Sequence, residues 1–144
     1  MSWVRIWVHT VFATKNRVPF LTKEIKVKVV DHIFKNAKTK EIIIHSLNGH
    51  LDHIHCLVSL NKDMTLSKTM QLIKGESSFW INKNKLTTEK FSWQDDYWAV
   101  SVSESHVERV SNYIKNQEEH HAKKSFENEI KLMSNKYGWK NSKG

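Results

Sequence analysis

His53-Ile-His-Cys-Leu-Val-Ser-Leu60 alternates as a β-strand does, and the fold can be worked out from this segment. Successive side chains of a strand point to opposite faces, so His53 and His55 share one face. Leu57 and Ser59 continue that face, and the other carries four apolar residues: Ile54, Cys56, Val58 and Leu60. Histidines two residues apart lie about 7 Å apart along a strand. Two such neutral imidazoles can converge on one divalent metal ion, and a pair of buried, hydrogen-bonded histidines is the alternative interpretation.

Residues 105–121 are the second informative stretch and have the pattern of a helix. Ser105 followed three residues later by Glu108 matches a capping box. The apolar stripe consists of Val107, Val110 and Ile114, and polar residues recur every three or four positions on the neighbouring face: His106, Arg109, Tyr113, Gln117 and His120. A helix docked over the histidine strand would therefore bring a phenol, Tyr113, and an amide, Gln117, beside two imidazoles. The alternative is that Tyr113 only borders the core.

The remaining pattern predicts one α+β domain over residues 1–144, with the element order β-α-β-β-α-β-α. Strands are expected at residues 3–13, from Ile42, at 53–60 and at 93–102, and helices at 23–38, 66–80, 105–121 and about 126–137. The Asn48-Gly49 turn predicts that the second and third strands form a hairpin. This order is that of a ferredoxin-like, split βαβ fold. We expect an antiparallel sheet with helices on one face and a catalytic helix near the C-terminus.

The composition favours a polyanionic partner. Lys and Arg number 23 against 15 Asp and Glu in 144 residues, which gives a formal net charge of +8. Nucleic acid is the expected partner, and an anionic membrane surface is the competing one. No apolar run approaches the roughly 20 residues of a membrane span, and the N-terminus lacks the order of a signal peptide, so we expect no membrane and a cytoplasmic location. The single cysteine, Cys56, excludes a thiolate metal cluster.

Five segments together resemble a known family. Asp52-His-Ile-His55 and Tyr113-Ile-Lys-Asn-Gln117 look like the motifs of the HUH-superfamily single-tyrosine transposases of small bacterial insertion sequences, the IS200-like transposases. Three further segments resemble that family in the same order: Val11–Arg17, Lys74-Gly75 and Trp93–Trp98. The resemblance spans nearly the whole chain and implies the same ferredoxin-like fold.

The resemblance implies a role for each motif residue. Tyr113 is the expected nucleophile, and His53, His55 and Gln117 are the expected ligands of Mg²⁺ or Mn²⁺. The doubled His120-His121 offers other ligands, and Tyr97 and Tyr137 are weaker nucleophile candidates. Residues in the motif stretches are interpreted as contacts to the DNA backbone, with a merely solvated side chain as the alternative for each: Lys15, Arg17 and Lys74.

These roles predict a transposase that cuts and rejoins single-stranded DNA by metal-assisted transesterification. A 5′-phosphotyrosine keeps the bond energy for rejoining, and the chain has no Gly-rich phosphate loop, so no nucleotide cofactor is expected. The partners would be single-stranded or hairpin DNA at element ends and a second copy of the chain, because one tyrosine holds one 5′ end. Two alternatives remain: a domesticated, replication or conjugation-type HUH nickase, and a non-catalytic nucleic-acid-binding module.

Overall fold

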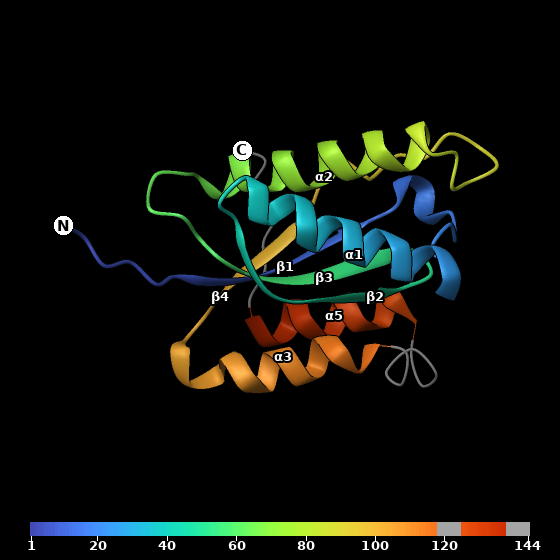
Figure 1. Cartoon of the computed structure of the whole chain (residues 1–144). Coiled ribbons are helices and arrows are strands. Elements are labelled where there is room, and N and C mark those ends of the chain that lie inside the picture. The colour runs from blue at the N-terminus through green and yellow to red at the C-terminus, as the bar shows by residue number, and fades with distance from the viewer. Residues whose placement is uncertain (118–124, 138–144) are drawn as a thin grey trace.

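The computed structural model describes residues 1–117 and 125–137 of the chain (Figure 1). The strands are β1 (Trp7–Ala13), β2 (Ile43–His50), β3 (His53–Ser59) and β4 (Trp98–Val102), and the α-helices are α1 (Lys23–Thr39), α2 (Leu66–Lys83), α3 (Val107–Lys115) and α5 (Phe126–Tyr137). Short 3-10 turns, η1 (Lys15–Arg17) and η2 (Glu104–His106), follow β1 and precede α3. The sheet has the order β2-β3-β1-β4, and all neighbouring strands are antiparallel. This confirms the α+β class and the split βαβ arrangement.

The helices lie on both sides of the sheet, with α1 and α2 on one face and α3 and α5 on the other (Figure 1). The expectation that all helices lie on one face is therefore wrong for α3 and α5, which cover the face opposite α1 and α2. The second face needs cover because it is apolar: Trp7 and Leu57 pack against α3, and Val11 packs against Phe126 of α5. Burial of this second apolar surface stabilises the terminal helices, which are too short to be stable alone.

Local sequence signals explain where α1 and α2 begin. The Thr22 side chain accepts a hydrogen bond from the Ile25 amide, and the Thr65 side chain accepts one from the Lys68 amide. A threonine that satisfies a free amide in the first turn stabilises a helix start. The expected cap at Ser105 is wrong: His106 is the residue before α3, and it makes no side-chain cap.

Two strands are shorter than the sequence pattern predicts. β1 begins at Trp7, which pairs with Ser59 of β3 and Val102 of β4, so residues 3–6 precede the ladder. β4 begins at Trp98, although Trp93 forms one isolated bridge with Thr14. The chain between Trp93 and Trp98 leaves the sheet.

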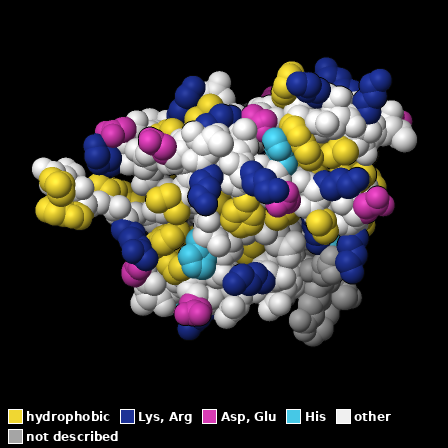
Figure 2. Space-filling model, in the orientation of Figure 1, with side chains coloured by type: hydrophobic (Ala, Val, Ile, Leu, Met, Phe, Trp, Pro, Cys, Tyr) yellow, Lys and Arg dark blue, Asp and Glu magenta, His cyan; other side chains and the backbone are white. Residues whose placement is uncertain are grey.

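The surface agrees with the basic composition. Figure 2 shows Lys and Arg side chains distributed across the face that α1 and α2 form, and apolar side chains at the projecting N-terminal end. In that end, Trp3 is 84% exposed. Within residues 1–117 and 125–137, no helix is both long enough and apolar enough to cross a membrane.

Candidate metal and tyrosine site

The two histidines of β3 lie under the α3 and α5 layer. His53 and His55 are fully buried, and the alternation of the strand turns both toward this face while Ile54 turns toward α1 and α2. Asp52, the residue before β3, holds the Nδ1 atom of His53 at 2.9 Å from its Oδ1 atom. A carboxylate on one ring nitrogen fixes the orientation and tautomer of a histidine, which leaves the other nitrogen to bind a ligand. The Nε2 atom of His53 therefore faces the site.

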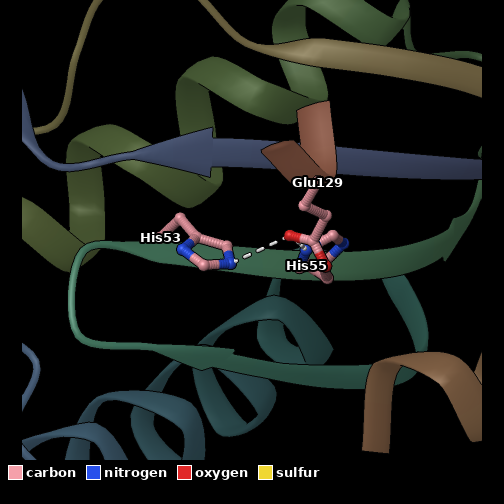
Figure 3. Close-up of side chains that lie close together, drawn as sticks. All are labelled: His53, His55 and Glu129. Carbon is pink, nitrogen blue, oxygen red and sulfur yellow. Dashed lines mark hydrogen bonds and ion pairs between the residues drawn. The ribbon is translucent and has the colours of Figure 1, made fainter. Parts of the chain in front are cut away.

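Glu129 of α5 lies between these two histidines (Figure 3). Its Oε1 atom is 3.0 Å from His55 Nε2 and 3.3 Å from His53 Nε2. One ligand atom from each of the three residues lies within 4.8 Å of the others. The side chain is buried, with 1% exposed. Two imidazole nitrogens and a carboxylate oxygen within this distance are a donor set that fits one divalent cation.

Sequence reasoning missed Glu129, although a signal for it exists. Phe126, Glu129 and Met133 are spaced three and four residues apart, so they lie on one face of α5, and all three are buried. A carboxylate in the buried stripe of an amphipathic helix needs partners. Here its partners are the site residues.

Tyr113 and Gln117 reach the same point from α3 and the residues after it. The Tyr113 hydroxyl donates a hydrogen bond to Glu129 Oε2, and its ring centroid lies 5.6 Å from that of His55. The Gln117 amide oxygen lies 3.1 Å from His53 Nε2, and its amide nitrogen donates to Glu129 over 3.2 Å. The structure thus brings together the four residues that the sequence singled out for nucleophile and ligands. His120 and His121 lie outside the described residues.

The site combines buried imidazoles with carboxylates. Burial opposes protonation of His53, yet the hydrogen bonds to Asp52 and Glu129 outweigh it and raise the pKa of His53 above its ordinary value. Behind His55, the Nε2 atom of His9 lies 2.9 Å from His55 Nδ1. Burial and the neighbouring His55 lower the pKa of His9 to about 3, so His9 is neutral at physiological pH. Carboxylates that favour positive charge at this place suit a bound cation.

Lys74 lies apart from the histidines and holds a loop. Its Nζ atom donates to the backbone carbonyls of Gln94, Asp95 and Asp96 over 2.6, 2.9 and 3.4 Å, and it lies 5.6 Å from the ring centroid of Tyr97. Burial lowers the pKa of Lys74, and the two aspartates oppose that shift. Lys74 therefore has a structural role in keeping the chain before β4 against α2.

Lys15 and Arg17 lie at the end of β1. The exposed Lys15 and the half-buried Lys74 line one groove of about 640 Å³ between α2 and the chain before β4. Arg17 forms an ion pair with Glu127 over 2.7 Å, and its guanidinium lies 5.0 Å from the ring centroid of Phe126. Phe126 in turn stacks on His53. Arg17 therefore holds the start of α5 against the site. A role of Lys15, Arg17 and Lys74 in DNA binding stays a prediction.

Comparisons with known proteins identify the family of this chain. The family model described as "Transposase IS200 like" matches residues 2–117. Transposases for insertion sequence element IS200 from Salmonella typhimurium and Salmonella typhi are each 29% identical over 115 residues, covering 76% of this chain and 74% of theirs.

Solved structures share the fold. A candidate transposase from Deinococcus radiodurans R1 has a TM-score of 0.65 at 21% identity and covers 81% of this chain and 93% of its own. A REP-associated tyrosine transposase bound to a REP hairpin has a TM-score of 0.60 at 19% identity, covering 84% of this chain and 72% of its own. The family match includes His53, His55, Tyr113 and Gln117, and ends before α5. This chain belongs to the IS200-like transposase family.

Proposed function

We propose that this transposase cuts and rejoins single-stranded DNA, with Tyr113 as the nucleophile. The observation that carries the proposal is the hydrogen bond from the Tyr113 hydroxyl to Glu129, whose carboxylate also contacts His53 and His55. A phenol next to a proton acceptor and a cation-binding donor set is the arrangement that an attack on a phosphodiester requires.

The chemistry follows from these contacts. The Tyr113 oxygen attacks the phosphorus, its proton passes to the Glu129 oxygen that it faces, and the bond from phosphorus to the 3′ oxygen breaks as that oxygen takes a proton from solvent. The products are a 5′-phosphotyrosine and a strand that ends in a 3′-OH. Because one ester replaces another, the step runs in reverse with a new 3′-OH and needs no nucleotide cofactor.

Mg²⁺ or Mn²⁺ is the proposed metal ion. His53 and His55 would hold it through their Nε2 atoms, with Glu129 and the Gln117 amide oxygen as further ligands, because these atoms already face one another. When bound, the ion shields the negative charge of the phosphate and activates it toward attack. Asp52 keeps the His53 ring oriented in this account.

The proposed DNA is a single strand or a hairpin at the ends of a mobile element. One solved relative of the same fold is described as bound to a REP hairpin, and the net charge of +8 favours a polyanion. We further propose a homodimer, because resealing the flanks of an excised element requires two strand cuts in one assembly. We also propose that residues 1–144 act as one catalytic domain in the cytoplasm, where the DNA substrate would be.

A nicking assay tests the function. Single-stranded DNA that carries the element end is incubated with the protein in Mg²⁺ and, separately, in EDTA. Cleavage is expected with Mg²⁺ only. Cleavage that is equal in EDTA would contradict the metal-assisted mechanism, and no cleavage of the element end in Mg²⁺ would contradict the transposase chemistry.

A further inference from the structure

A cavity of about 290 Å³ lies between α3 and α5, beside the tyrosine. His9 of β1 is part of its lining, together with Tyr113 of α3 and Glu129 of α5. Figure 1 shows α3 and α5 running next to each other under the sheet. The volume is close to the lower limit of about 300 Å³ for small-ligand pockets. The cavity therefore has room for one small planar group rather than for a duplex.

His9, one of the lining residues, has a buried polar atom that is unsatisfied. Its side chain is 1% exposed, and its Nε2 atom is paired with His55. Its Nδ1 atom is the buried side-chain nitrogen or oxygen, within the described part of the chain, that has no hydrogen-bond partner. A buried polar atom without a partner costs free energy, so a partner from a ligand would be favourable. The edges of nucleobases carry both donors and acceptors, and so match His9 in either tautomer.

Charged side chains line the cavity at two places. The buried carboxylate of Glu129 lies beside Tyr113, so a phosphate there needs the proposed metal ion to offset the repulsion. Two exposed cations, Arg109 of α3 and Lys136 of α5, also line the cavity. A nucleotide would therefore place its uncharged base inside, the attacked phosphate at the metal site and its second flanking phosphate toward these cations.

The walls suit the face of a base. Val110 of α3 and Leu132 and Met133 of α5 are apolar residues of the lining, contributed by two different helices. Apolar side chains, and the adaptable thioether of methionine, pack well on flat ring systems. The α5 wall lies beyond residue 117, where the family match ends, so this half of the cavity belongs to the part of the chain outside that match.

We propose that the cavity between α3 and α5 binds one unpaired nucleobase of the single-stranded DNA substrate, next to the phosphate that Tyr113 attacks. This inference rests on the proposed function, since it assigns to that site a contact that positions the strand. The base lies beside His9, whose Nδ1 atom it would hydrogen-bond, packs against Val110 and the α5 side chains, and directs its second flanking phosphate to Arg109 and Lys136.

Binding to base-containing and abasic DNA tests the cavity. Affinities are measured by fluorescence anisotropy in EDTA for oligonucleotides of about 12 nucleotides, one of dT, one of dC, one of dA and one fully abasic with the same charge. The wild type is expected to bind at least one base-containing strand about tenfold more tightly than the abasic strand. Leu132→Trp, which fills the cavity from the side of α5, should remove this preference. Lys131→Trp places the same ring on a neighbouring exposed position outside the cavity and should retain it.

Photo-crosslinking locates the base independently of the effect of any substitution. A dT strand with one 5-iodouracil is irradiated in complex with the wild type, and the crosslinked peptide is identified by mass spectrometry. The expected crosslink lies within residues 107–115 or 126–137, and Leu132→Trp should abolish it. Equal affinities for base-containing and abasic strands, a preference that survives in Leu132→Trp, or a crosslink only elsewhere would each overturn the proposal.

Measurements on the same protein in Mg²⁺ and in EDTA distinguish a failure of the cavity proposal from a failure of the proposed function on which it rests. In Mg²⁺, the covalent adduct on Tyr113 reports the transesterification, whereas the EDTA measurements report the cavity alone. Adduct formation without a base preference overturns the cavity and leaves the mechanism intact. The opposite result is a base preference and a crosslink at α3 or α5 without an adduct. It overturns the mechanism and the placement of the base next to an attacked phosphate. The cavity would then still be a base-binding site.

Discussion

The Tyr113 hydroxyl is hydrogen-bonded to Glu129, and the same carboxylate contacts the Nε2 atoms of His53 and His55. One buried carboxylate therefore joins the candidate nucleophile to the candidate metal ligands. Because Glu129 belongs to α5, the site is complete only when α5 packs over the two histidines.

Replacing His53 or His55 by alanine is expected to abolish DNA cleavage and to weaken Mn²⁺ binding by more than about tenfold. Most of the DNA affinity should remain, because it comes chiefly from phosphate contacts. Calorimetry with Mn²⁺ and the nicking assay measure the two effects. His45→Ala, at an exposed histidine of β2, is the control and should behave as the wild type. Cleavage at the wild-type rate by both site variants would refute the metal site.

Glu129→Gln tests whether the carboxylate belongs to the cation site. The amide keeps the shape of the side chain and removes its charge, so the affinity for Mn²⁺ is expected to fall about tenfold. The Tyr113 hydroxyl would also lose its proton acceptor, and cleavage should slow further. Glu108→Gln, an exposed change on α3, serves as the matched control. An unchanged Mn²⁺ affinity would remove Glu129 from the ligand set and leave Gln117 as the third ligand.

The salt dependence of DNA binding distinguishes Lys15 from Lys74. The logarithm of the binding constant for a single strand should fall with the logarithm of salt concentration by about 0.7 per phosphate neutralised, and Lys15→Ala should remove about one such increment. Lys74 already donates to three backbone carbonyls, so Lys74→Ala should lower the free energy of unfolding by about 1–3 kcal/mol, as measured in urea. A Lys74→Ala protein with unaltered stability and a reduced salt slope would reverse this assignment.

Much of the fold and part of the site follow from sequence patterns, for physical reasons. The alternation in residues 53–60 and the spacing of Tyr113 and Gln117 are local periodicities, and they place these residues correctly before any tertiary contact is known. The strand boundaries at Trp7 and Trp98 depend instead on where the partner strands end, which no local pattern encodes. The pairing with neighbouring strands therefore makes β1 and β4 shorter than the sequence pattern predicts.

The stripe of α5 indicates that Glu129 is buried, but local patterns do not identify its partners, because these are far away in sequence. Its contact with His55 joins positions 74 residues apart, and it exists only because α5 covers the second face of the sheet. The same packing explains Arg17, which the motif assigned to DNA and which pairs with Glu127 of α5. The packing of α5 on the second face of the sheet, which was not expected, therefore explains the contacts of both Glu129 and Arg17.

The oligomeric state is a separate prediction. Light scattering of the protein with hairpin DNA is expected to give the mass of two chains per complex, because two cuts must be held together for resealing. The protein should be measured at several concentrations, so that a weak dimer is detected by mass action. A monomer bound to DNA at every concentration would contradict the homodimer.

The residue that becomes covalently joined to DNA is the most direct evidence for Tyr113 as the nucleophile. Wild-type protein is incubated with Mg²⁺ and single-stranded DNA of the element end, denatured, and analysed by peptide mass spectrometry beside Tyr113→Phe, which loses one oxygen and keeps the ring. The account predicts a 5′-phosphotyrosine on Tyr113 in the wild type, and in the variant DNA binding without adduct or cleavage. An adduct on Tyr97 or Tyr137, cleavage by the variant, or wild-type cleavage without any adduct would contradict it.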